Sequence, residues 1–185
     1  MTVPNFLTLC RILLTPLLIW LLLDRKLNEA LVVFFVAGLT DGLDGMVARV
    51  FHQKSQLGAY LDPLADKILL VSSFLLLGHL ELVPDWLVVI AVSRDAIILL
   101  GLMTLMYHHI AFEIKPVFLS KLTTLLQLGS VLAAISSACA PLPPWGYTTL
   151  FTLTAVFTIA SGVYYLLLGI ELLDSRRNNH DGHHK

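Results

Sequence analysis

Charged residues are scarce in this chain. They make up 14% of its 185 residues, whereas hydrophobic residues make up 57%, and the mean hydropathy is +0.81. A soluble globular domain carries about 25% charged residues, so this composition excludes that class and predicts a membrane protein. The net charge is −1 and the basic residues form no stripe, so we expect no nucleic-acid partner. Cysteine is also scarce: Cys10 and Cys139 lie far apart in apolar segments and predict neither a disulfide nor a metal site.

Apolar runs of near 20 residues, long enough to cross about 30 Å of hydrocarbon, can be placed six times. They are Leu7–Leu23, Glu29–Val50, Gly58–Leu80, Pro84–Tyr107, Lys121–Cys139 and Tyr147–Leu173. No internal repeat is apparent. The predicted fold is therefore all-α, with six transmembrane helices in one bundle. Residues 1–175 form the predicted membrane domain, and residues 176–185 form a polar cytoplasmic tail, in which we expect Asn178–Lys185 to be disordered.

The distribution of Lys and Arg predicts the orientation of these spans. With the N-terminus in the cytoplasm, most cations fall on or near that side, and only Arg25 and Lys26 fall on the other. The cations on the cytoplasmic side are Arg11, Arg49, Lys54, Lys115, Lys121, Arg176, Arg177 and Lys185. We therefore expect a multi-pass protein with both termini in the cytoplasm, located in the cytoplasmic membrane if the source is a bacterium.

Four aspartates stand close together in this apolar chain: Asp41, Asp44, Asp62 and Asp66. An uncompensated carboxylate at bilayer depth costs several kcal/mol, so a group of four needs partners. On a helix, Asp41 and Asp44 lie about 60° apart around the axis. Asp62 and Asp66 lie about 40° apart on the next helix, with Pro63 expected in its first turn. This arrangement predicts a site for divalent metal.

Small residues accompany the aspartates: Gly42, Gly45, Ala48, Gly58 and Ala59. They leave room for a flat or bulky ligand close to the backbone, so the predicted ligand is a phosphate bound through metal. The structural alternative is that the carboxylates are charge-paired and only hold the bundle together.

Written as a pattern, the stretch reads D-x-x-D-G-x-x-A-R, eight residues, then G-x-x-x-D-x-x-x-D. Every fixed position resembles the signature of the CDP-alcohol phosphatidyltransferases, integral membrane enzymes that make phospholipids. Intramembrane prenyltransferases also use Asp-rich motifs with Mg²⁺ and diphosphates. They give the Gly-x-x-Ala-Arg segment no role, so the first family is favoured.

The resemblance implies transfer of the phosphatidyl group of CDP-diacylglycerol to an acceptor hydroxyl, with release of CMP. It implies two ions of Mg²⁺ or Mn²⁺, roughly 3.5 to 4 Å apart, with Asp41, Asp44 and Asp62 as ligands. Asp66 lies at the edge of this cluster as a further ligand and is implied as the base that takes the hydroxyl proton. The residues implied to line the CDP pocket are Gly45, Ala48, Arg49, Gly58 and Thr8. Membrane lipids surround such enzymes, and the resemblance also implies a homodimer.

Three cations are candidate contacts for the acceptor or its phosphate: Arg11, Arg94 and Lys121. The opening P-N-F-L-T-L-C-R resembles the beginning of the family, which places Thr8 and Arg11 at the site; otherwise Arg11 reaches anionic headgroups. Arg94 stands beside Asp95 within the fourth span and is either structural or binds an anionic headgroup. Lys121 is either a cytoplasmic anchor or a phosphate contact.

The acceptor is predicted from two positions. Family members that use glycerol 3-phosphate resemble one another in the patterns Arg-Glu-x-x-x-x-x-x-Arg and Gly-Lys-x-Lys-Thr. Leu102 and Thr123 stand where these patterns have their second cation. Arg94-Asp95 and Ser120-Lys121 instead look like the cardiolipin-synthesising members, whose acceptor is the singly charged lipid phosphatidylglycerol. We expect phosphatidylglycerol, a glycerol-based acceptor, with glycerol 3-phosphate as the alternative.

A non-enzymatic alternative is an ion or proton carrier that uses intramembrane carboxylates. Transport predicts acidic residues spread across the bilayer or across two related halves. The four aspartates instead cluster at one predicted level, which favours the enzyme.

Overall fold

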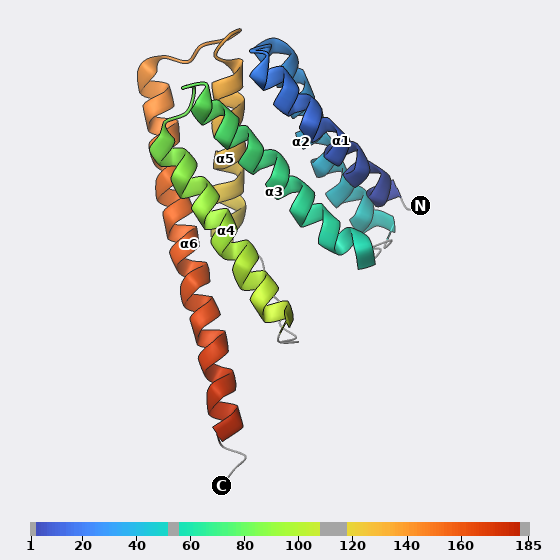
Figure 1. Ribbon diagram of the computed structural model, residues 1–185, viewed down its shortest axis with the longest axis vertical. Helices are drawn as coiled ribbons and strands as arrows, with labels where there is room; N and C mark the ends of the chain where they lie inside the picture. Colours follow the sequence, from blue (N-terminus) through green and yellow to red (C-terminus); the bar gives the residue numbers. More distant parts are fainter. Residues whose placement is uncertain (1–2, 52–55, 108–117, 182–185) are drawn as a thin grey trace.

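Six α-helices make up the described part of the chain, and they run alternately up and down (Figure 1). The computed structural model describes the backbone of residues 3–51, 56–107 and 118–181, and the side-chain surroundings of 11–40, 67–101, 103 and 118–169. The helices are α1 (Val3–Leu23), α2 (Leu27–Phe51), α3 (Gln56–His79), α4 (Asp85–Tyr107), α5 (Phe118–Ser136) and α6 (Pro144–Asp181). Because these ranges contain no strand, the all-α prediction is confirmed.

The predicted spans agree with the helices to within a few residues, except at the end of α6. This helix continues to Asp181, beyond the predicted end at Leu173, so the prediction of a disordered tail is wrong as far as Asp181. Residues 170–181 contain neither proline nor glycine, and Asp174 stands three residues before Arg177, a spacing at which opposite charges support a helix. In Figure 1, α6 extends well beyond the other helices at the lower end.

A second correction concerns Pro63. Because α3 begins at Gln56, Pro63 lies beyond the first turn rather than within it. A proline at that depth removes the N–H that would bond to the carbonyl of Ala59. Membrane helices tolerate this loss where neighbouring groups satisfy the carbonyl, and α1 likewise contains Pro16. The helical register of the motif is unaffected.

Two connections at the upper end of the bundle close with the same backbone motif. Arg25 has a φ of 56°. The N–H of Arg25 donates to the carbonyl of Leu22 at 3.0 Å, and the N–H of Lys26 donates to the carbonyl of Leu21 at 2.9 Å. Glu81, with a φ of 60°, closes α3 with the equivalent pair of bonds. These paired bonds satisfy carbonyls that a helix end leaves free, which offsets the cost of the left-handed backbone. The helices therefore reverse direction over very few residues.

The six helices form two groups of three. In the N-terminal trio α1 packs against α2 and α3, and in the C-terminal trio α6 packs against α4 and α5. The trios meet where α2 and α3 contact α5 and where α3 contacts α4. Among the residues whose side chains are described, large apolar side chains that are fully buried include Leu18, Leu22, Phe34, Phe74, Leu77 and Leu87. These side chains pack the helices together near the upper connections.

Two helical segments among the described residues are long and apolar enough to cross a membrane by themselves: Phe118–Ser136 and Pro144–Gly169. Shorter apolar segments of α1, α2 and α3 cover Arg11–Leu23, Leu27–Thr40 and Lys67–His79. These lengths support a membrane protein without establishing six spans.

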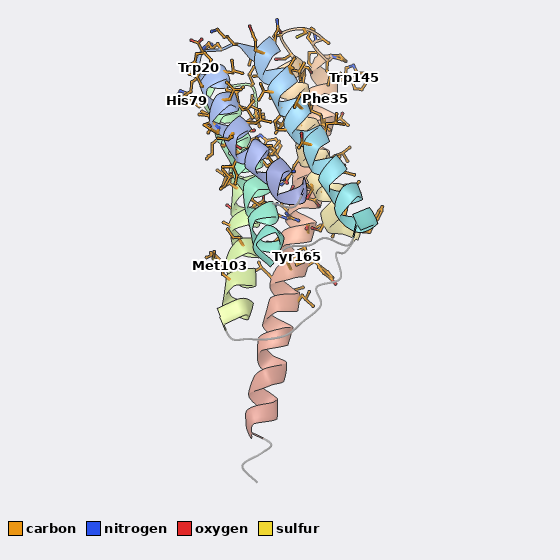
Figure 2. The ribbon with its side chains drawn as sticks, turned by 90° about the vertical axis from the view of Figure 1, so that its right-hand side faces the viewer. Trp20, Phe35, His79, Met103, Trp145 and Tyr165 are labelled. Carbon is orange, nitrogen blue, oxygen red and sulfur yellow. The ribbon has the colours of Figure 1, made fainter. Side chains whose placement is uncertain are left out.

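Large apolar side chains cover the outside of the bundle. Leu13, Phe35 and Val89 are 65%, 58% and 63% exposed. Trp20 and Trp145 lie at the upper end (Figure 2), where Lys26 sits 4.9 Å from the centre of the Trp20 ring. A surface of this kind is typical of a protein that faces lipid.

Candidate functional site

The Asp-rich motif lies on the lower halves of α2 and α3. Asp41 and Asp44 come late in α2, and Asp62 and Asp66 come early in α3, so both pairs are helical as predicted. Because the two helices follow one another in opposite directions, the pairs lie toward the same end of the bundle (Figure 1). The side chains of the four aspartates lie outside the described residues, as do those of Thr8, Gly45, Ala48, Arg49 and Gly58. Their roles stay predictions.

Arg94 joins the three helices of the C-terminal trio. Its Nη1 donates to Oδ1 of Asp95 at 2.7 Å, and its Nη2 donates to Oγ of Ser120 on α5 at 3.0 Å and of Ser161 on α6 at 2.9 Å. Arg94 and Asp95 are each 4% exposed. A buried guanidinium needs several acceptors to offset the loss of water, and these three neighbours supply them.

Lys67 extends this group to the N-terminal trio. Its Nζ donates to the same Oδ1 of Asp95 at 2.6 Å, and the Lys67 side chain is 27% exposed. Lys67 is the residue after Asp66 on α3. We call the group the Asp95 network; its members are Lys67, Arg94, Asp95, Ser120 and Ser161. One carboxylate oxygen therefore holds two cations from two different helices.

The network bears on the two roles that the sequence left open for Arg94. Its terminal nitrogens are engaged in structural hydrogen bonds, whereas its buried Nε has no hydrogen-bond partner within the described part of the chain. Gly162 lies against the stem, because a Cβ there would come 3.4 Å from Cγ of Arg94. The side chain is therefore clamped, and its Nε–H is left without a described partner.

The other two candidate cations are Arg11 and Lys121, and Lys121 directly follows Ser120 of the network. Arg11 is 1% exposed within α1, and its carbonyl accepts a 2.9 Å hydrogen bond from the hydroxyl of Thr15. Lys121 is exposed at the start of α5 and makes no ion pair with any residue whose side chain is described. Burial of Arg11 agrees with a place inside the bundle, and exposure of Lys121 agrees with a surface anchor.

A polar seam joins α5 to α6 above the network. The hydroxyl of Thr123 lies 3.0 Å from the carbonyl oxygen of Phe157, and the hydroxyls of Ser130 and Thr154 lie 2.8 Å apart. Gln127, between them on α5, is fully buried, and neither polar atom of its amide has a partner among the described residues. Hydroxyl side chains of this kind hold membrane helices together through bonds to neighbouring helices.

Two cavities border the described residues. One of about 250 Å³ lies between α3 and α4, where Lys67 and Asp95 form part of its wall. The larger, of about 530 Å³, is lined by Glu81, Trp86 and Tyr147 at the upper end, away from the motif. Of these two cavities, the smaller is therefore nearer to the predicted site. No group of three His, Cys, Asp or Glu side chains that could hold a metal occurs among the described residues.

Comparison with known sequences decides the family. The CDP-alcohol phosphatidyltransferase profile matches residues 1–166, a range that holds both the Asp-rich motif and the Asp95 network. The chain belongs to this family. The resemblance inferred from the motif is confirmed.

One similar protein is the cardiolipin synthase (CMP-forming) of Rattus norvegicus. It is 35% identical over 179 residues, which cover 88% of this chain and 59% of the relative. The enzyme of the same name from Homo sapiens is 34% identical, over 88% of this chain and 60% of the relative. That from Streptomyces coelicolor is 35% identical over 114 residues, which cover 58% of this chain and 53% of the relative. The matched region spans about three fifths of the length of the two mammalian relatives.

Two residues of the Asp95 network, Lys67 and Ser161, were not assigned to a site from the sequence. Lys67 stands in an apolar run. A cation within a membrane helix usually pairs with an acidic side chain and often belongs to a functional site, so its partner has to be identified. That partner, Asp95, was visible in the sequence but could not be matched to Lys67, since 28 residues separate them. Ser161 gave no signal, because single serines are common in membrane helices.

Proposed function

We propose that this chain transfers the phosphatidyl group of CDP-diacylglycerol to phosphatidylglycerol, forming cardiolipin and releasing CMP. The observation that carries the proposal is the similarity to CMP-forming cardiolipin synthases over 88% of this chain. The Asp-rich motif lies within the range that matches the family profile. Family membership alone leaves the acceptor open.

In the proposed reaction, the hydroxyl oxygen of the acceptor attacks the phosphatidyl phosphorus. A new P–O ester bond forms, the bond from this phosphorus to the oxygen bridging the diphosphate breaks, and CMP leaves with that oxygen. Asp66 takes the proton of the hydroxyl, which makes the oxygen a better nucleophile. Arg49 offers a guanidinium to the phosphates of CDP, and Gly45, Ala48, Gly58 and Thr8 leave room for the nucleotide.

Divalent metal fits the residues of the motif. Four carboxylates on two helices provide the hard oxygen ligands that Mg²⁺ and Mn²⁺ prefer, and the helical register gives each pair one face. Asp41, Asp44 and Asp62 would hold the metal, with Asp66 at the edge. Bound metal would neutralise the diphosphate and so stabilise CMP as the leaving group.

The choice of phosphatidylglycerol rests on the charges near Arg94. At position 123, where a second cation would favour a dianionic phosphate, the buried Thr123 hydroxyl bonds across the α5–α6 seam. Arg94 itself is partly neutralised by Asp95, and its Nη2 is already bonded to two serine hydroxyls. This balance supports a singly charged phosphodiester, with Arg11 and Lys121 as further candidate contacts.

We further propose that all six helices span the membrane and that residues 1–175 form one membrane domain. The apolar exterior and the alternating helix directions support this topology. The excess of Lys and Arg at the lower end supports a cytoplasmic location for the motif, where a soluble nucleotide product can leave. Homodimer formation remains a proposal from family resemblance.

The test is release of CMP by the purified full chain in detergent or liposomes. CDP-diacylglycerol and Mg²⁺ or Mn²⁺ are supplied, and phosphatidylglycerol and glycerol 3-phosphate are offered separately. We expect CMP and cardiolipin with phosphatidylglycerol only. CMP release with glycerol 3-phosphate alone would overturn the choice of acceptor. Cation flux into liposomes without CMP would instead favour the ion carrier.

A further inference from the structure

We propose that Asp95 is a positioning residue that sets the lower half of α3 against α4, and thereby places Asp62 and Asp66 for the reaction. The inference rests on the proposed function for its link to catalysis, but its structural part can be tested without any substrate. Asp95 acts through Lys67, which follows Asp66 directly on α3.

The first support is the cavity between α3 and α4. Its volume is about 250 Å³, and its wall includes Val71 of α3 and Val92 and Leu99 of α4 together with the Lys67–Asp95 pair. Apolar side chains across such a gap make few contacts with one another, so packing alone fixes the spacing of the helices weakly here. The 2.6 Å hydrogen bond from Lys67 to Asp95 spans the two helices at this point.

The second support is that Asp95 is itself held in place. Oδ1 of Asp95 accepts from Arg94 at 2.7 Å, and Arg94 is bonded to Ser120 and Ser161 on the other two helices of the C-terminal trio. A chain of contacts therefore runs from α5 and α6 through Arg94 and Asp95 to Lys67. Asp95 can serve as a fixed reference because its neighbour is tied to three helices at once.

The third support is the position of the side-chain hydrogen bonds that join the two trios. Two hydrogen bonds between described side chains connect them: Lys67 to Asp95, and Sγ of Cys139 to Oδ1 of Asn28 at 2.7 Å. The second bond lies at the upper end, whereas the Lys67–Asp95 bond lies next to the motif. Beside the packing of α3 against α4 and α5, the Lys67–Asp95 bond therefore holds the motif helix against the C-terminal trio.

The test measures a distance and an activity on the same protein. Spin labels are placed at Leu13→Cys on α1 and Met103→Cys on α4, which are 65% and 56% exposed, in a background with Cys10 and Cys139 replaced by serine. Labelled chains are diluted with unlabelled chains so that pairs between two copies do not contribute. Pulsed dipolar spectroscopy then reports the separation of the trios with and without Asp95→Asn.

We expect Asp95→Asn to shift or broaden the distance distribution and to lower kcat by about 100-fold per folded protein, with little change in the KM for CDP-diacylglycerol. Lys67→Met should reproduce both effects while it keeps the Arg94–Asp95 pair. This variant therefore replaces Asp95→Asn in the test if Asp95→Asn does not fold. Asp95→Glu should retain most activity. The matched control is Asp24→Asn, which breaks the exposed 2.7 Å pair with Lys26 and should change neither readout.

Two results would overturn the inference. Loss of kcat with an unchanged distance distribution would mean that Asp95 acts on the substrate directly. An unchanged distance distribution with unchanged kcat would remove any role in positioning. If the parent chain releases no CMP, the proposed function fails, whereas the distance measurement still decides the structural part.

Discussion

Lys67, the residue that follows the last aspartate of the motif, donates a 2.6 Å hydrogen bond to Oδ1 of Asp95 on the neighbouring helix α4. This bond connects the predicted metal-binding segment to a buried polar group in the other half of the bundle. Arg94 and Asp95 of this group are buried, so the described part of the bundle tolerates buried charge close to the predicted phosphate site.

Asp66 is predicted to act as the base rather than as the main anchor of the nucleotide. Asp66→Asn should abolish CMP release, because an amide cannot accept the hydroxyl proton, and should leave binding of CDP-diacylglycerol largely intact. Turnover and equilibrium binding are measured on the same preparation. Equal loss of both would remove the assignment.

Arg94→Lys should both weaken the bundle and impair use of the acceptor. A lysine can keep the pair with Asp95 but cannot reach both Ser120 and Ser161, because it lacks the planar fork of arginine. We expect the free energy of unfolding to fall by about 1–3 kcal/mol and the KM for phosphatidylglycerol to rise. Lys121→Met, at an exposed position, should change stability by less than about 0.5 kcal/mol. Equal changes in stability for the two variants would contradict the network.

Gly78 and Gly38 form a matched pair for packing. A Cβ on Gly78 would come 2.8 Å from Cγ2 of Val88, a stiff β-branched side chain, whereas a Cβ on Gly38 would meet nothing within 4 Å. Gly78→Ala should destabilise the fold by about 1–3 kcal/mol. Gly38→Ala should stabilise it by about 0.5–1 kcal/mol, because alanine favours a helix. Thermal unfolding in detergent measures both, and the opposite order would show that α3 and α4 are packed differently.

Gln127 is predicted to lower the stability of the bundle. Its amide is fully buried, and neither polar atom has a hydrogen-bond partner among the described residues. An unsatisfied buried group costs about 1–3 kcal/mol, so Gln127→Met, which keeps the volume, should raise the unfolding temperature. Ser130→Ala is the contrasting variant, because it breaks the 2.8 Å bond to Thr154 and should lower that temperature. Destabilisation by Gln127→Met would mean that the amide is satisfied in the folded protein.

The helices could be predicted from the sequence because apolar length and punctuation determine them. Two predictions failed where local rules compete. Pro63 indicates a helix start, but α3 begins at Gln56, and the polar composition after Leu173 suggests disorder, but α6 continues to Asp181. In both cases continuation of an existing helix, which adds a hydrogen bond with each residue, outweighed the local signal.

The site could be predicted only in part. The spacing of the aspartates specifies a motif within two adjacent helices. The family predicted from that motif was confirmed by the profile match. The pairing of Lys67 with Asp95 depends on how α3 lies against α4, which sequence spacing does not encode. The same holds for Arg94 and Ser161, which are 67 residues apart.

The central claim is that Asp41, Asp44, Asp62 and Asp66 together bind divalent metal that holds the diphosphate of CDP-diacylglycerol. The most direct test is an experimental structure of the full chain with CDP-diacylglycerol and Mn²⁺, in which anomalous scattering locates the metal. The account predicts Mn²⁺ within coordination distance of these carboxylates and of the diphosphate. Aspartate oxygens that point apart or face lipid, with Mn²⁺ elsewhere, would contradict it.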